Sequence, residues 1–203
     1  MIENFEFGRL TILGDLLLDK YVFGSVSRIS PEAPVPVLLK THQTIVPGGA
    51  ANVAVNAAAL GCKVNLIGVV GDDKQGDVLR HTLSKWPGID LGGLVAEAGW
   101  STICKTRVLS GQQQIVRIDE ENIVTFSPAT NERLIVATKA ALENTDVLIC
   151  SDYAKGVLSD SVLRAVIDHA RSLNIPVIVD PKRKNFAAYR GASLITPNRA
   201  EMA

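Results

Sequence analysis

The feature that most constrains the fold is a series of short apolar runs, separated from one another by longer and more polar stretches. Runs that are apolar at nearly every position are typical of strands buried on both faces of a parallel sheet. They occupy residues 10–13, 64–70, 147–150, 175–179 and 194–195. Together with the helical patterns between them, they predict an α/β fold with a doubly wound, mostly parallel, Rossmann-like sheet.

Four of the intervening segments have the composition and periodicity of helices. We predict helices over residues 50–60, 74–85, 131–142 and 160–173. The last is the best defined, because Ser159 is a favourable N-cap and apolar residues recur at helical spacing along one face. These apolar residues are Val162, Leu163, Val166, Ile167 and Ala170.

An adjacent glycine pair, Gly48 and Gly49, leads into the first of these helices. Glycine allows a ligand to approach the backbone, and the first turn of a helix offers unpaired N–H donors and a positive dipole end. Asn52 lies in that first turn, and Asn56 lies one turn further on the same face. Two interpretations are equally consistent with the pattern: a docking site for hydroxyls or anionic oxygens, and a tight turn into a small-residue helix that packs closely on the sheet.

Polar residues follow five of the predicted strands. Because ligands of doubly wound sheets bind beyond the carboxyl ends of the strands, we expect these residues to share one cleft. Turn formation or helix capping explains any single acid equally well, but five such strand ends favour a cleft. The mixture suits a polyhydroxylated, phosphorylated ligand and a magnesium-bound nucleotide. The residues are Asp15, Asp72 with Asp73, Asp152 with Lys155, Asp180 with Lys182, and Asn198 with Glu201.

Two segments, at about residues 20–46 and 102–120, predict a small β lid inserted into the main body. Three prolines within residues 30–39 exclude a helix and a central strand, so the first segment is expected to be extended edge structure, with a long surface loop as the alternative. Residues 102–120 alternate around Ser110 and Gly111 and predict a hairpin, with which the first segment is able to pair.

The composition argues against several classes of function. Lys+Arg and Asp+Glu number 21 each, so no general field attracts nucleic acid or a membrane surface. The three cysteines lack C-x-x-C spacing, and the three histidines lack metal-ligand spacing, which argues against a disulfide framework and a zinc site. No signal core and no run of about 18 apolar residues is visible. These features predict a cytoplasmic protein.

The common nucleotide-binding motifs do not fit the chain. Gly71 and Gly76 have the spacing of a P-loop, but Asp77 and Val78 stand where Lys and Ser or Thr are required. No G-x-G-x-x-G follows a predicted strand, which argues against a hydride carrier.

Several segments nevertheless resemble the ribokinase-like (PfkB) carbohydrate kinases. Residues 47–54 resemble the first signature of that family, and residues 14–15, 71–73 and 198–201 match further motifs in the expected order. Longer segments resemble the heptose 7-phosphate kinases of the family, which often form the N-terminal half of a bifunctional kinase/adenylyltransferase for ADP-heptose and lipopolysaccharide core synthesis. These segments are residues 27–37, 105–109, 113–117, 151–156, 180–182 and 196–198.

The resemblance implies an ATP- and Mg²⁺-dependent kinase. It would phosphorylate D-glycero-β-D-manno-heptose 7-phosphate at the anomeric hydroxyl, giving the 1,7-bisphosphate. Asp15 would hold sugar hydroxyls, while Gly48, Gly49 and Asn52 would line the sugar site and Asp152 would belong to the substrate-binding set. The lid would close over the sugar to exclude water, and in relatives it also joins two subunits, which implies a homodimer.

For the phosphate of the sugar, the resemblance implies Lys155 or Arg117, since charge-assisted contacts to phosphate are strong. Lys155 is favoured because it follows a strand end. The alternatives are a solvated loop lysine at position 155 and a surface ion pair between Arg117 and Glu120 or Glu121.

For the nucleotide, the resemblance implies binding of the phosphates and magnesium by Asn198, Arg199, Ala200 and Glu201, with Glu201 acting through water. Lys182 is a further nucleotide-binding candidate, and a surface cation is the alternative interpretation.

One family motif is missing from the sequence. The kinase domain of the family continues to a Gly-Ala-Gly-Asp motif, which supplies the general-base aspartate and an anion hole, and residues 1–203 do not contain it. We therefore expect residues 1–203 to be a truncated ribokinase-like kinase domain with little or no turnover of its own. The alternatives are another PfkB-family sugar kinase and a non-catalytic fragment that binds a sugar phosphate or dimerises.

Overall fold

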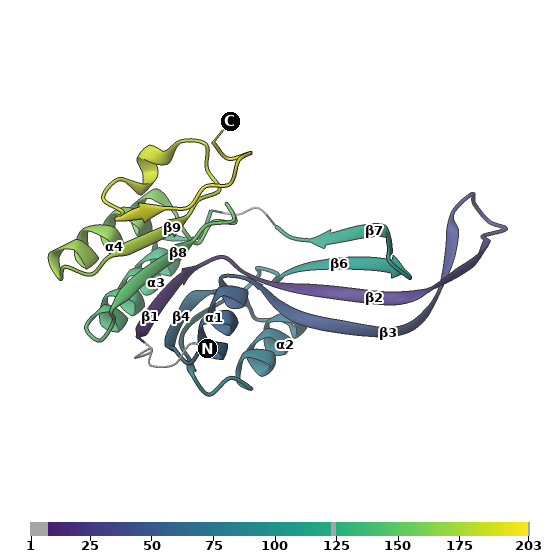
Figure 1. The fold of residues 1–203 in the computed structure, drawn as a ribbon, viewed down its shortest axis with the longest axis horizontal. Helices are drawn as coiled ribbons and strands as arrows, with labels where there is room; N and C mark the ends of the chain where they lie inside the picture. The colour runs from purple at the N-terminus through teal and green to yellow at the C-terminus, as the bar shows by residue number, and fades with distance from the viewer. Residues whose placement is uncertain (1–7, 123–124, 203) are drawn as a thin grey trace, which may run out of the picture.

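Two β-sheets form the structure, a computed structural model that describes residues 8–122 and 125–202 (Figure 1). The larger sheet has six strands in the order β10-β9-β8-β1-β4-β5, and the smaller has four in the order β3-β2-β6-β7. The strands of the larger sheet are β1 (Arg9–Gly14), β4 (Lys63–Gly71), β5 (Ile89–Glu97), β8 (Val147–Ser151), β9 (Val177–Asp180) and β10 (Leu194–Ile195). Those of the smaller sheet are β2 (Leu16–Ile29), β3 (Pro36–Gly49), β6 (Ile103–Ser110) and β7 (Gln113–Glu120).

Every neighbouring pair in the six-stranded sheet is parallel, which confirms the predicted fold class. The sequence pattern identified all of these strands except β5. That strand contains the glycine pair Gly92-Gly93, which is unusual within a strand. Gly93 lies over Ile67 of β4, where a Cβ atom would come within 2.6 Å of the isoleucine side chain.

Helices cover both faces of the six-stranded sheet, as apolar strands without alternation require. Helices α1 and α2 pack on one face, against residues such as Ile12 and Leu66, while α3 and α4 pack on the other face, against Leu13 and Ile67. Consecutive strand residues therefore enter different apolar clusters. The helices are α1 (Ala50–Ala59), α2 (Lys74–Leu83), α3 (Pro128–Leu142) and α4 (Asp160–Ser172), and a short 3-10 helix, η1, spans Phe186–Tyr189.

The caps of the helices follow from their sequence. The Ser159 hydroxyl accepts the Val162 N–H at the start of α4, as predicted, and all five apolar residues assigned to the inner face of α4 are buried. At α2 the capping residue is Asp73, whose carboxylate accepts the Gly76 N–H at 2.7 Å. Asp73 therefore serves the fold as a helix cap.

The four-stranded sheet extends from the body as a long arm (Figure 1). Only Asp15 separates β2 from β1, so the arm is a direct continuation of the central sheet's chain. Strand β2 pairs in parallel with β6 of the predicted hairpin and antiparallel with β3. Since β3 carries Pro36 and Pro47, its position at the edge is the one that proline allows.

The strand order of the larger sheet reverses between β1 and β8. From β1 the chain builds outward through β4 and β5, whereas the later strands build outward from β8 through β9 to β10. The carboxyl ends of β1 and β8 lie side by side, with Gly14 paired in register to Ser151. This junction is the switch point at which doubly wound sheets bind ligands. Within the described ranges, no helix combines the length and apolar character that crossing a membrane requires.

Candidate functional site

Asp15 lies at the switch point and organises the loop that follows β8. Its Oδ2 atom accepts the N–H groups of Tyr153 at 2.8 Å and Lys155 at 3.1 Å, and its Oδ1 atom accepts the N–H of Val157 at 3.1 Å. The residue is 1% exposed. Burial raises the pKa of this carboxyl, although the three backbone N–H groups act to lower it.

These contacts change the role expected for Asp15. Both carboxylate oxygens already accept protein N–H groups, and the side chain is buried, so Asp15 does not present a free carboxylate to a sugar. Its place in the structure is that of a positioning residue, which fixes the backbone of Lys155. The predicted direct contact with sugar hydroxyls does not fit this geometry.

Asp152 is likewise taken up by the protein itself. Its Oδ1 atom accepts the Ala154 N–H at 2.7 Å, its Oδ2 atom accepts the Tyr189 hydroxyl at 2.7 Å, and the same Oδ2 atom forms an ion pair with Arg183, 3.2 Å from Nε. Burial, followed by the hydrogen bond to Asp152, raises the pKa of Tyr189 to about 12. Asp152 therefore fastens the 180–190 segment to the β8–α4 loop, and its predicted contact with substrate does not fit.

The glycine pair lies where β3 ends against β2. A Cβ atom on Gly48 would come within 2.2 Å of Leu17 Cδ1 and 2.4 Å of Asp19 Oδ2, and one on Gly49 would come within 2.3 Å of the Asp15 carbonyl oxygen. Gly49 also has a φ of +58°, in the region that favours glycine. Both glycines are thus required by close packing within the protein. Asn52, at the start of α1, is exposed.

The contact with Gly48 identifies an acid that sequence reasoning missed. Asp19 lies on β2 two residue pairs beyond the Leu17–Gly48 pair, and its carboxylate forms an ion pair with the guanidinium of Arg107 on β6. That guanidinium also lies over the Tyr21 ring, 5.4 Å from its centre. The hydrogen bond to Asp19 raises the pKa of Arg107. In the sequence, an apolar run directly follows Asp15, and Asp19 is the acid that ends this run. Asp19 lies two positions from Leu17 and therefore on the same face of the strand, which is the signal that could have identified it.

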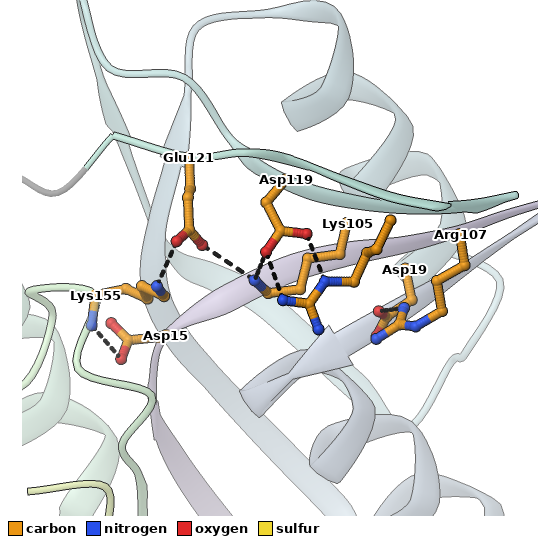
Figure 2. A network of polar contacts seen from close by, with 8 residues as sticks. Asp15, Asp19, Lys105, Arg107, Asp119, Glu121 and Lys155 are labelled. Atoms are coloured by element: carbon orange, nitrogen blue, oxygen red, sulfur yellow. Dashed lines mark hydrogen bonds and ion pairs between the residues drawn. The ribbon is translucent and has the colours of Figure 1, made fainter. Parts of the chain in front are cut away.

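A chain of ion pairs joins the two sheets (Figure 2). The Lys155 ammonium, from the loop after β8, lies 2.8 Å from Glu121 Oε1, and the Lys105 ammonium of β6 lies 3.1 Å from Glu121 Oε2. Lys105 also contacts Asp119 of β7 at 3.1 Å, and Asp119 in turn accepts two hydrogen bonds from Arg117 at 2.9 and 3.0 Å. The surface ion pair considered for Arg117, with Glu120 or Glu121, is formed with Asp119 instead.

The network brings together cations from different parts of the sequence. Asp119, Lys105 and Asp19 are aligned across three neighbouring strands, because β6 pairs residue 105 with residue 119 on one side and with residue 19 on the other. Lys105, Arg107 and Lys155 are thereby collected near the switch point, each next to a carboxylate. The hydrogen bond from Lys155 is the main cause of the lowered pKa of Glu121. The alternation of residues 103–109 placed Lys105 and Arg107 on one face of the hairpin, but gave no indication of their partners.

The segment expected to bind the nucleotide forms a capping box. The Asn198 side chain accepts the N–H groups of Ala200 and Glu201, and the Glu201 carboxylate accepts the Asn198 N–H at 2.9 Å. Lys182 lies 3.3 Å from the other oxygen of Glu201. These residues follow β9 and β10, so they lie at the same edge of the sheet as the switch point. Within the described ranges, no group of three or more His, Cys, Asp or Glu side chains is arranged to hold a metal ion.

Comparison with known protein families identifies one that matches nearly the whole chain. The model of the pfkB family carbohydrate kinases matches residues 13–203. The chain belongs to this family.

Known relatives of this pfkB-family chain are longer than it is. It is 59% identical over 201 residues to the bifunctional protein HldE of Gluconobacter oxydans, covering 99% of this chain and 42% of that protein. It is 53% identical over 203 residues to the bifunctional protein HldE of Azorhizobium caulinodans, covering all of this chain and again 42% of the relative. The pfkB-family chain thus spans less than half the length of these relatives.

Solved structures confirm the ribokinase-like fold. Arabidopsis thaliana ribokinase, solved in complex with ribose and ATP, superposes with a TM-score of 0.69 at 18% identity, covering 96% of this chain and 61% of that one. A putative ribokinase from Agrobacterium tumefaciens gives the same TM-score at 19% identity, covering 96% of this chain and 60% of that one.

Proposed function

We propose that this chain is the sugar-binding part of an ATP-dependent kinase acting on D-glycero-β-D-manno-heptose 7-phosphate. The γ-phosphoryl group of ATP passes to the anomeric hydroxyl, the hydroxyl gives up its proton to a base, and ADP and the 1,7-bisphosphate are formed. The observation that carries the proposal is the 59% identity to a bifunctional HldE protein, which extends over 99% of the chain. Identity at that level along the whole match supports a shared acceptor.

The geometry supports one particular division of labour at the acceptor site. Asp19 lies against Gly48 at the mouth of the switch point, with Arg107 beside it, and is 20% exposed at its side chain. Unlike Asp15, it is available to hydroxyl groups. We assign Asp19 to the sugar hydroxyls, with Gly48, Gly49 and Asn52 around it, and Asp15 to the positioning of the neighbouring loop.

The phosphate of the acceptor is assigned to Lys155, which lies at the same junction of the two sheets. A kinase that acts on a sugar phosphate needs a fixed cation for the phosphate, and positioning of this kind supplies much of the rate in phosphoryl transfer. Arg117 is a weaker choice, because its side chain is 50% exposed and is held by Asp119 through two hydrogen bonds.

The nucleotide is assigned to residues 198–201, together with Lys182. Mg²⁺ is commonly bound by one or two carboxylates and the phosphates of its substrate, so a single carboxylate at Glu201 fits the ion, with contact through water because both oxygens of Glu201 already have partners. When bound, the ion would neutralise charge on the nucleotide phosphates. Residues 198–201 would hold the phosphate end of the nucleotide toward the acceptor.

The four-stranded sheet is proposed to act as the lid and as the contact between two subunits. It continues directly from β1 and carries Asp19, Lys105 and Arg107 on one face, so its movement would bring these groups onto the sugar. Its strands also expose apolar side chains, such as Leu39 at 72% and Ile118 at 51%. Light scattering during gel filtration tests the dimer, and a monomer at micromolar concentration would contradict it.

The test of the reaction uses the full-length protein that contains this chain. ATP consumption is measured with heptose 7-phosphate, ribose and fructose 6-phosphate as acceptors, and the heptose product is identified by mass. Phosphorylation of the heptose phosphate supports the proposal. Turnover of ribose or fructose 6-phosphate without turnover of the heptose phosphate would refute the acceptor assignment and leave another pfkB-family sugar kinase.

A second candidate is supported by one sequence observation. Residues 1–203 contain no Gly-Ala-Gly-Asp motif, so the chain by itself is proposed to bind a sugar phosphate with little or no turnover. Calorimetry on the 203-residue chain separates the two cases. Binding of the sugar phosphate without ATP hydrolysis supports the non-catalytic description of this chain, and robust turnover would overturn it.

A further inference from the structure

Glu121 lies between a lysine of the four-stranded sheet and a lysine of the loop that follows β8, and its position is unlike that of the other carboxylates in the network. Lys105 belongs to β6, and Lys155 belongs to the loop after β8. Glu121 lies just past the end of β7 and contacts both ammonium groups, at 3.1 and 2.8 Å (Figure 2). It is therefore the residue through which the four-stranded sheet is fastened to the body at this point.

The two lysines are positioned by backbone hydrogen bonds that do not involve Glu121. The N–H of Lys155 is bound by the buried carboxylate of Asp15, and the strands on both sides of Lys105 fix its register. Asp119 is a second partner of Lys105 and remains in place if Glu121 leaves. The lysines thus form a fixed pair of cations, while the anion between them comes from a residue outside any strand.

The pair requires an anion between its members. The Lys105 and Lys155 side chains are only 16% and 17% exposed, so water screens their mutual repulsion less than it would at the surface. The hydrogen bond from Lys155 is the largest cause of the lowered pKa of Glu121, so the two lysines favour a negative charge between them. A phosphate monoester carries more charge than a carboxylate at neutral pH and offers three acceptor oxygens. It is therefore the stronger bridge between two ammonium groups.

We propose that Lys105 and Lys155 together form a binding site for a phosphate monoester, and that Glu121 occupies this site until the ligand phosphate displaces it. The proposal rests on the proposed function for the identity of the ligand, an acceptor sugar phosphate. It assigns Lys105 a role in binding and makes Glu121 an internal competitor. Because Lys105 lies on the four-stranded sheet and Lys155 in the loop after β8, a phosphate bound between them would replace Glu121 as the bridge between this sheet and the body.

Calorimetry on the 203-residue chain tests this site without using turnover. D-glycero-D-manno-heptose 7-phosphate and the unphosphorylated heptose are titrated into the wild-type chain, Glu121→Gln, Lys105→Met and the double variant. Glu132→Gln is the matched control, since it removes the charge of an exposed glutamate on α3. Circular dichroism confirms that each variant is folded.

The expected result is about a tenfold gain in affinity for the phosphate ester in Glu121→Gln, which corresponds to the loss of one charge-assisted competitor. Lys105→Met loses about tenfold, the gain from Glu121→Gln shrinks in the double variant, and the unphosphorylated sugar and Glu132→Gln show no such changes. If Glu121→Gln binds the ester no better than Glu132→Gln does, Glu121 is not a competitor. If Lys105→Met binds the ester as tightly as the wild type does, Lys105 is not a ligand. Either result overturns the site.

Failure of the proposed function gives a different pattern. If the full-length protein phosphorylates some other sugar phosphate, the four chains are titrated with that compound instead, and the same order of affinities is expected. Equal affinity of the wild-type chain for the phosphorylated and unphosphorylated forms of the accepted sugar would refute the phosphate site while leaving the kinase activity standing.

Discussion

Replacement of Asp15 by asparagine tests whether this residue organises the β8–α4 loop. Asparagine keeps the size of the side chain but has one carbonyl oxygen in place of two carboxylate oxygens. In the structure those two oxygens accept three N–H groups at 2.8 to 3.1 Å, and the residue is 1% exposed. The new amide nitrogen would face a backbone donor, whichever way the side chain is turned.

The size of the effect follows from two opposing contributions. A buried donor left without an acceptor costs about 1–3 kcal/mol, and one or two of the three N–H groups lose their acceptor. Removing a buried charge offsets part of this, because burial is the main cause of the raised pKa of Asp15. We expect a net loss of about 2 kcal/mol, which lowers the Tm of a chain of this length by about 4–8 °C.

Thermal and urea unfolding followed by circular dichroism measure this loss, with Asp168→Asn on the exposed face of α4 as the control. Calorimetry adds a readout specific to the loop. Because Asp15 positions Lys155, the affinity for heptose 7-phosphate should fall more than the affinity for unphosphorylated heptose. A Tm within about 1 °C of the wild type, together with unchanged affinity for the phosphate ester, would refute the positioning role.

Three further changes test other parts of the account. Gly48→Ala places a Cβ atom 2.4 Å from Asp19 Oδ2. It should lower the stability by about 1–3 kcal/mol and weaken binding of the unphosphorylated sugar. Unchanged binding of that sugar would contradict the role assigned to Asp19. Tyr189→Phe removes the 2.7 Å hydrogen bond to Asp152 and should cost about 1–2 kcal/mol in urea unfolding, whereas an unchanged midpoint would show that the bond contributes nothing. Because the pKa of Glu121 is lowered in the folded chain, its ion pairs stabilise the fold above the unfolded pKa near 4.5 and are lost as the pH falls through the folded value. Wild-type and Glu121→Gln stabilities, which should differ at pH 7, are therefore expected to converge in acid, and a constant difference would count against the ion pairs.

The sequence was sufficient to predict the central sheet because its strands are apolar on both faces and end in polar residues. The same pattern failed at β5, where polar and glycine residues at the sheet's edge hid the strand. It also missed the start of β2 at Leu16, since the lid was expected only from about residue 20. The cap at Ser159 was predicted correctly because it depends on residues close together in the sequence.

The candidate site was harder to predict because its contacts join distant parts of the chain. The strand ends marked the edge of the sheet at which the candidate site lies, and Lys155 is among the residues that they indicated. An acid at a strand end looks the same in the sequence whether it faces a ligand or binds backbone N–H groups, and Asp15 and Asp152 turned out to do the latter. The roles of Glu121 and Lys105 depend on contacts over 16 and more residues, which no local pattern contains.

We expect a phosphorylated sugar to lie at the junction of the two sheets, with its hydroxyls at Asp19 and its phosphate between Lys105 and Lys155. A crystal structure of the 203-residue chain with heptose 7-phosphate tests it most directly. We expect the phosphate to lie within hydrogen-bond distance of both ammonium groups, Glu121 to be turned away from them, and the sugar ring to lie beside Gly48. A sugar phosphate bound elsewhere, with the Lys105–Glu121–Lys155 bridge intact, would contradict it.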